Sequence, residues 1–119
     1  MSFRSKLSRV VEHVDGALGC MLIDFEGMEI DWFPRDGTEE PLRMIAVELS
    51  TLLRKLRMTR IDDQEEVNEV SLRFGSVTTL AKIIGGEYML VLSLGESGDV
   101  SRGQTMLRLI APYVEKELL

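Results

Sequence analysis

Few side chains in this sequence have the type and spacing that catalysis requires. His13 is the only histidine among the 119 residues, so a catalytic triad or a multi-histidine metal site would depend on it alone. Its position at the end of an expected first helix favours a capping or surface role. Cys20 is the only cysteine, which excludes an intramolecular disulfide and a cysteine-based zinc site. Its apolar neighbours indicate a buried, unreactive thiol.

Two further segments resemble ligand sites in composition only. An acidic run lacks the glycine and the spacing of a calcium-binding loop; it consists of Asp62, Asp63, Glu65 and Glu66. The segment 95–103 is rich in glycine and precedes an expected helix, but it has no Gly-Lys-Ser/Thr, and Glu96 and Asp99 would repel an anion. We therefore expect no cofactor, no metal ion and no enzymatic activity.

A basic cluster is the better candidate for a binding site, and it consists of Arg54, Lys55, Arg57 and Arg60. Two interpretations of this cluster remain open. Positive charge is favourable at the C-terminus of a helix, and it also suits contact with an acidic partner surface. The chain as a whole carries a net charge of −6, which argues against nucleic acid as a partner.

The hydrophobic pattern predicts the elements that must position these side chains. We expect helices over 3–14, 38–58 and 100–118, and strands over 17–24, 28–33, 67–74, 76–84 and 88–94. Thr38 and Asp99 are expected to cap the second and third helices, and Pro112 should bend the third or mark an irregular turn. The order αββαβββα predicts one α+β domain over 1–119, with a five-stranded antiparallel sheet and helices on both faces.

The composition also predicts where the protein resides. No apolar run approaches the roughly 20 residues that a membrane span requires, so we expect no direct membrane insertion. The N-terminus leads straight into an amphipathic pattern with no signal region, which favours a cytoplasmic location.

The second expected helix has two apolar faces. One broad stripe should pack on the sheet, and it consists of Leu42, Ile45, Ala46, Leu49, Leu52, Leu53 and Leu56. The opposite side holds Met44, Val47, Thr51 and Met58, where a solvated helix would carry charged residues. Scattered exposed hydrophobes are common, but the spacing of three, four and seven residues favours an interface with a second copy or another partner.

Residues Gly16 to Ile30, GALGCMLIDFEGMEI, resemble the opening hairpin of the dynein light-chain Roadblock family. In that family a short helix leads into a Gly-Ala-like start, an apolar strand, an Asp-x-x-Gly turn and a second strand. Here the turn is Asp24 to Gly27, and the order of elements matches along almost the whole chain.

The resemblance implies a profilin-like sandwich, with the second helix on one face of the sheet and the terminal helices on the other. It also implies a homodimer formed by the second helix and the edge strand 67–74, which adds Val70 and Leu72 to the expected interface. Members of this family regulate or scaffold small Ras-like GTPases, and bacterial gliding-motility members stimulate such a GTPase without being hydrolases. Two alternatives stay open: an adaptor that binds independently of nucleotide, and a small-ligand sensor with an apolar pocket against the sheet.

Overall fold

The computed structural model describes residues 3–58 and 67–118. The elements follow the predicted order, with boundaries that differ from the expected ones by a residue or two. They are α1 (Arg4–His13), β1 (Ala17–Asp24), β2 (Glu29–Pro34), α2 (Glu39–Arg57), β3 (Glu69–Phe74), β4 (Val77–Ile84), β5 (Tyr88–Leu94) and α3 (Val100–Leu118). The expected α+β architecture is confirmed.

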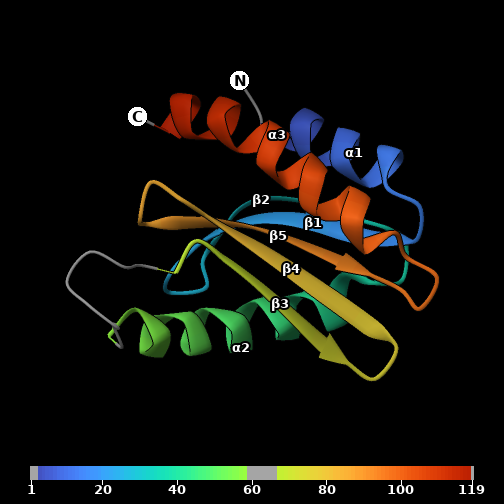
Figure 1. Ribbon diagram of the computed structural model, residues 1–119, viewed down its shortest axis with the longest axis horizontal. Helices are drawn as coiled ribbons and strands as arrows, with labels where there is room; N and C mark the ends of the chain where they lie inside the picture. Colours follow the sequence, from blue (N-terminus) through green and yellow to red (C-terminus); the bar gives the residue numbers. More distant parts are fainter. Residues whose placement is uncertain (1–2, 59–66, 119) are drawn as a thin grey trace.

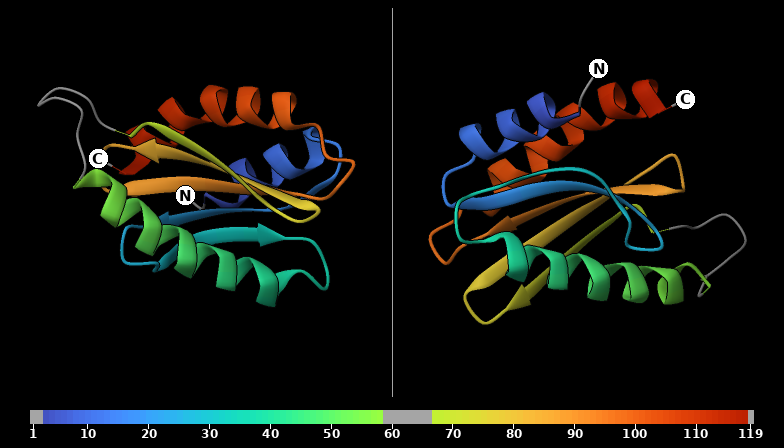
Figure 2. Two further views of the ribbon diagram at one scale, coloured as in Figure 1. Left: turned by 60° about the horizontal axis from the view of Figure 1, so that its bottom comes forward. Right: turned by 180° about the vertical axis from the view of Figure 1, so that it is seen from behind.

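The five strands form one antiparallel sheet in the order β2-β1-β5-β4-β3. The central strand β5 pairs with β1 on one side and with β4 on the other, so Val91 lies opposite both Met21 and Ala81. Helices α1 and α3 lie side by side on one face of this sheet, and α2 covers the other (Figures 1 and 2). The arrangement of helices that the Roadblock resemblance implies is therefore confirmed.

Alternation along β5 divides the core into two halves. Leu90 and Leu92 point into the half beneath α1 and α3, whereas Met89 and Val91 point into the half above α2. All four side chains are buried. A strand covered on both faces should be apolar almost throughout, which explains the continuous apolar run of β5.

The side-chain cap expected from Thr38 is wrong, and of the two outcomes expected at Pro112, a bend or an irregular turn, the irregular turn does not occur. Thr38 occupies the N-cap position of α2, but its side chain caps no helical N–H. Its hydroxyl oxygen instead lies 3.1 Å from the carbonyl oxygen of Leu18 and 2.6 Å from that of Arg35, and these two oxygens share its single hydrogen. The contact ties the loop to β1. Helix α3 runs through Pro112 as one α-helix, without the irregular turn that this proline suggested.

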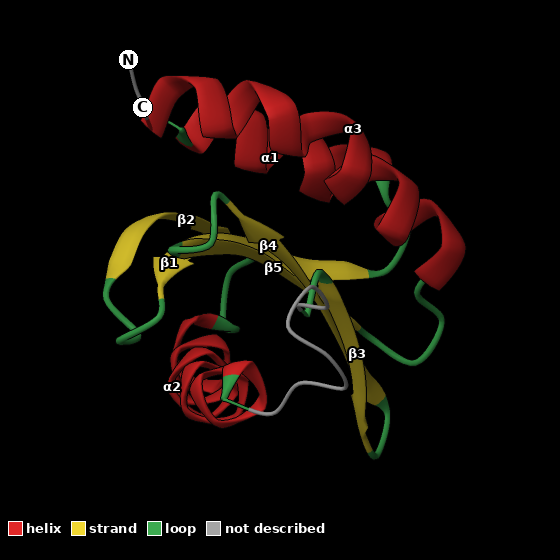
Figure 3. Ribbon diagram, turned by 60° about the vertical axis from the view of Figure 1, so that its left-hand side comes forward, coloured by secondary structure: helices red, strands yellow, loops and turns green. Residues whose placement is uncertain are grey.

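The sheet curves around α2, so that the edge strand β3 descends beside the helix (Figure 3). This curvature places the apolar side of β3 and one flank of α2 next to each other. No helix in the described parts of the chain is long and apolar enough to cross a membrane.

Candidate functional site

The outward side of α2 carries large apolar side chains that no other described part of the chain covers. Met44 is 64% exposed, Val47 is 53% exposed and Met58, the residue after the helix, is 88% exposed. Thr51 is half-buried on the same side. The inward residues of the helix are buried, and they include Leu42, Ala46, Leu49 and Leu53. Clustered apolar side chains on a surface mark sites of protein interaction.

A second set of α2 residues widens this surface toward β3. Ile45, Leu52 and Leu56 are half-buried, and helical periodicity places them on one flank of α2. Leu56 packs in the core cluster that also takes in Val70 and Leu72 of β3. From their spacing alone, these three residues were expected within the inward stripe. Their position at the edge of that stripe is the signal that could have identified them.

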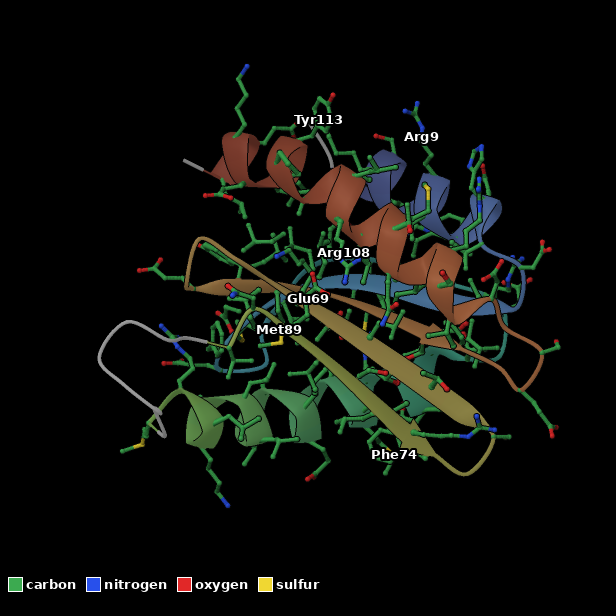
Figure 4. The ribbon with its side chains drawn as sticks, in the orientation of Figure 1. Arg9, Glu69, Phe74, Met89, Arg108 and Tyr113 are labelled. Atoms are coloured by element: carbon green, nitrogen blue, oxygen red, sulfur yellow. The ribbon has the colours of Figure 1, made fainter. Side chains whose placement is uncertain are left out.

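Strand β3 continues the apolar surface. Val70 and Leu72 are half-buried and face α2. Phe74 lies two residues further along, at the end of the strand, and is 49% exposed (Figure 4). The structure thus brings the expected interface residues of α2 and of β3 to the same side of the sheet.

The backbone of β3 offers an open hydrogen-bonding edge, because β3 ends the sheet and pairs only with β4. The N–H of Ile83 donates to the oxygen of Asn68 at 2.9 Å, and such bonded pairs recur at every second residue. The N–H and C=O groups of Glu69, Ser71 and Arg73 therefore point away from β4. A strand edge of this kind is a template for pairing with another chain.

An ion pair fixes the beginning of β3 to α3. Two nitrogens of Arg108 bind the two carboxylate oxygens of Glu69 at 2.8 and 2.7 Å (Figure 4). Lys82 of β4 lies 3.9 Å from the same carboxylate. The hydrogen bonds from Arg108 lower the pKa of Glu69, and the Glu69 carboxylate in turn raises the pKa of Arg108. The edge strand is thereby held to the helix layer on the opposite side of the sheet.

The basic cluster does not converge on a single spot. The guanidinium of Arg57 lies 4.3 Å from the ring centre of Phe25, on the turn between β1 and β2. Arg54 and Lys55 are both exposed, and as neighbours in a helix they point about 100° apart. Arg54 lies on the side of Thr51, whose hydroxyl is 3.4 Å from its guanidinium. Arg60 lies outside the described residues.

The remaining candidates for chemistry have structural roles or no described position. His13 is exposed, and its Nδ1 lies 2.8 Å from the carbonyl oxygen of Arg9. Cys20 is buried, and this burial raises the pKa of its thiol to about 12. The Asp99 carboxylate accepts from the N–H of Arg102 at 3.0 Å, so the expected cap of α3 is confirmed.

No group of three or more histidine, cysteine or carboxylate residues that could hold a metal ion occurs in the described ranges. The acidic run from Asp62 to Glu66 lies outside them. The feature that the geometry does assemble is the apolar surface of α2 and β3 with its open strand edge.

Neither a comparison with protein-family models nor a search of curated proteins finds a match to this chain. Solved structures do match. MglC from Myxococcus xanthus is 34% identical, has a TM-score of 0.76, and is similar over 98% of this chain and 99% of its own.

Two other structures share the fold at lower identity. A Roadblock/LC7 domain from Streptomyces avermitilis is 18% identical with a TM-score of 0.75, over 96% of this chain and 98% of its own. A structure described as MglB with a tetrameric arrangement is 15% identical with a TM-score of 0.83, over 94% and 84%. At these identities the two structures show the fold alone.

Proposed function

This chain belongs to the Roadblock/LC7 family, and from that membership we propose that it acts as a non-catalytic dimer that regulates a small Ras-like GTPase. The observation that carries the proposal is the exposed apolar face of α2 beside the open edge of β3. Exposed apolar area is costly in water, and the open edge offers N–H and C=O groups for pairing with another strand. A second copy packed here would cover the first and pair with the second.

The geometry favours a two-fold dimer. In such a dimer the same patch meets itself, so α2 packs on the partner's α2 while the two β3 edges pair. Met44, Val47, Thr51 and Met58 would lie in the helix contact, and Val70 and Leu72 would lie in the strand contact. A stable interface buries about 800 Å² per partner, which a helix of this length together with one strand can supply. The tetrameric arrangement of an MglB structure indicates that this fold supports self-association.

The GTPase contact is assigned to the exposed basic residues near the C-terminal end of α2. Arg54 and Lys55 are exposed there, and Arg60 follows in the sequence. Arg57 contributes less, because its guanidinium already stacks on Phe25. Long-range attraction to an acidic surface raises the rate of association, and its strength falls with added salt.

The test is a pull-down with the full chain from the native lysate, run in parallel with GDP and with a slowly hydrolysed GTP analogue. A Ras-like GTPase retained mainly with the analogue supports the regulator, and a hydrolysis assay with the purified pair then measures stimulation. Retention of partners regardless of nucleotide would instead identify an adaptor. Retention of no protein partner would leave the small-ligand sensor as the better interpretation.

A charge reversal tests the partner surface separately. The double variant Arg54→Glu/Lys55→Glu should weaken GTPase retention about tenfold or more, because it reverses both charges that would face the acidic surface. The dimer should persist, because its helix contact depends on the apolar side chains Met44, Val47 and Met58. Lys116→Glu, an exposed charge reversal on α3, is the control and should bind normally. Equal retention by the double variant and the control would show that the basic residues are not the contact.

A further inference from the structure

A second surface lies on the opposite side of the sheet from α2. Helices α1 and α3 run side by side there (Figure 2). Their side chains line a groove of about 330 Å³. The side chains that line it are Lys6 and Arg9 of α1, and Met106, Leu109, Ile110 and Tyr113 of α3. Arg9 and Tyr113 both project away from the sheet (Figure 4). The groove shares no residue with the α2–β3 surface.

The wall formed by α3 is apolar. Leu109 is 62% exposed and Tyr113 is 66% exposed, and their spacing of four residues places them one turn apart on the helix. Met106 is half-buried one turn earlier, and Ile110 forms a buried floor at 8% exposure. A leucine and a tyrosine exposed side by side above a buried floor offer anchoring points for another apolar side chain.

The wall formed by α1 is basic. Lys6 forms an ion pair with Glu117 across one end of the groove. Arg9 is exposed, and it makes no side-chain hydrogen bond or ion pair with any described residue. Beyond the other end, Arg102 lies one turn before Met106, with its Nε bound to the carbonyl oxygen of His13 at 2.9 Å. Positive charge is thus gathered beside an apolar wall on a chain whose net charge is −6.

We propose that the groove between α1 and α3 is a docking site for an acidic amphipathic segment of another protein. Its apolar side chains would pack on Leu109 and Tyr113, and its carboxylates would face Arg9. A two-fold contact between copies would set the same basic surface against itself, which is unfavourable. The concave shape accommodates a helix or an extended segment better than a flat membrane.

The proposal goes beyond the dimer and the GTPase contact. It predicts that each chain can hold a second partner while α2 and β3 are occupied, because the sheet separates the two surfaces. Its test therefore uses a probe that does not depend on the GTPase or on the dimer.

The probe is a labelled synthetic peptide of about 14 residues, or about four helical turns, with leucines on one face and glutamates beside them. A matched peptide carries lysine at every glutamate position, and a scrambled peptide keeps the composition but loses the apolar face. Fluorescence anisotropy measures binding to the full chain. Amide NMR shifts in the ¹⁵N-labelled protein then locate the contact. We expect saturable binding for the glutamate peptide alone, and amide shifts confined to residues of α1 and α3.

Three variants identify the groups that act. Arg9→Glu should weaken binding of the glutamate peptide about tenfold or more and strengthen binding of the lysine peptide, since the charge pairing is reversed. Leu109→Ser/Tyr113→Ser should weaken the glutamate peptide by a similar factor. Lys55→Glu makes the same charge change at the GTPase contact on α2, and it should leave binding of the glutamate peptide unchanged. All four side chains are exposed, so the variants should fold normally by circular dichroism.

Several outcomes would overturn the proposal. One is no binding of the glutamate peptide up to about 1 mM, and another is equal binding of the glutamate and lysine peptides. A third is a set of NMR shifts confined to α2 and β3. A change in oligomeric state on Arg9→Glu would show that the groove holds a second copy. Binding to phosphatidylserine vesicles that Arg9→Glu abolishes, without peptide binding, would assign the groove to a membrane surface.

Discussion

Gly16 lies where the chain enters β1, pressed against the loop that precedes α3. Its φ is +77°, and a Cβ at this position would lie 2.5 Å from the Cα of Gly98. The loop is held there by the N–H of Gly95, which donates to the Gly16 oxygen at 2.8 Å. Gly16→Ala should therefore lower the free energy of unfolding by about 2–4 kcal/mol, through backbone strain and displacement of the loop. Urea denaturation measures the loss.

Gly37→Ala is the matched control. Gly37 has a similar φ of +82°, but a Cβ there would meet nothing within 4 Å. This variant should lower the free energy of unfolding by only about 1 kcal/mol, the cost of placing alanine at a positive φ. Equal losses for the two variants would mean that the contact with Gly98 has no energetic consequence.

Single residues were predictable from the sequence where their role is local. Cys20 lies within an apolar strand and is buried, and Asp99 caps the helix that starts directly after it. Thr38 was not predictable, because its hydroxyl binds Leu18, a residue of another strand. Ile45 and Leu52 were misassigned for a related reason, since the depth of burial at the edge of a helical stripe depends on how the sheet curves.

Elements were predictable because periodicity is strong along this chain. The alternation in β3 and the continuous apolar run of β5 each predict a β-strand, and turns that contain glycine separate the strands. What periodicity cannot give is contact between distant segments. The bidentate pair of Glu69 with Arg108 joins residues 39 apart and follows only from the packing of α3 over the sheet edge.

That pair predicts a pH dependence of stability. The pKa of Glu69 is lowered from its usual 4.5, so the carboxylate is stabilised in the folded state. Its contribution is present above the pKa of the unfolded state and is lost as the pH falls through the lower, folded pKa. Wild type should exceed Glu69→Gln in unfolding free energy by a small margin at pH 7, and the margin should shrink below about pH 4.5.

Urea denaturation over a series of pH values measures this margin. Glu87→Gln, at the turn between β4 and β5, is the control because Glu87 forms no ion pair with the described residues. A margin for Glu69→Gln that grows as the pH falls would reverse the assigned sign.

At the scale of the molecule, the sheet separates an apolar surface on α2 and β3 from a groove on α1 and α3. We expect charges introduced on the first surface to break the dimer, and charges introduced in the groove to leave it intact. Met44→Glu/Val47→Glu should convert a dimer into a folded monomer, with the dissociation constant raised at least about a hundredfold, because buried charge has no partner in the contact. Light scattering coupled to gel filtration should report the mass of one 13.5 kDa chain in place of two.

The control is Leu109→Glu/Tyr113→Glu, which places the same charges on side chains that are 62% and 66% exposed, against 64% and 53% for Met44 and Val47. It should remain a dimer.

Ser71→Pro tests the contribution of the strand edge apart from that of the helix contact, since it removes an N–H at the open edge and leaves pairing with β4 intact. It should weaken the dimer less than the α2 variant, because pairing of the strand edges adds to the helix contact. If the α3 variant dissociated the dimer and the α2 variant did not, the dimer interface would lie at the groove between α1 and α3.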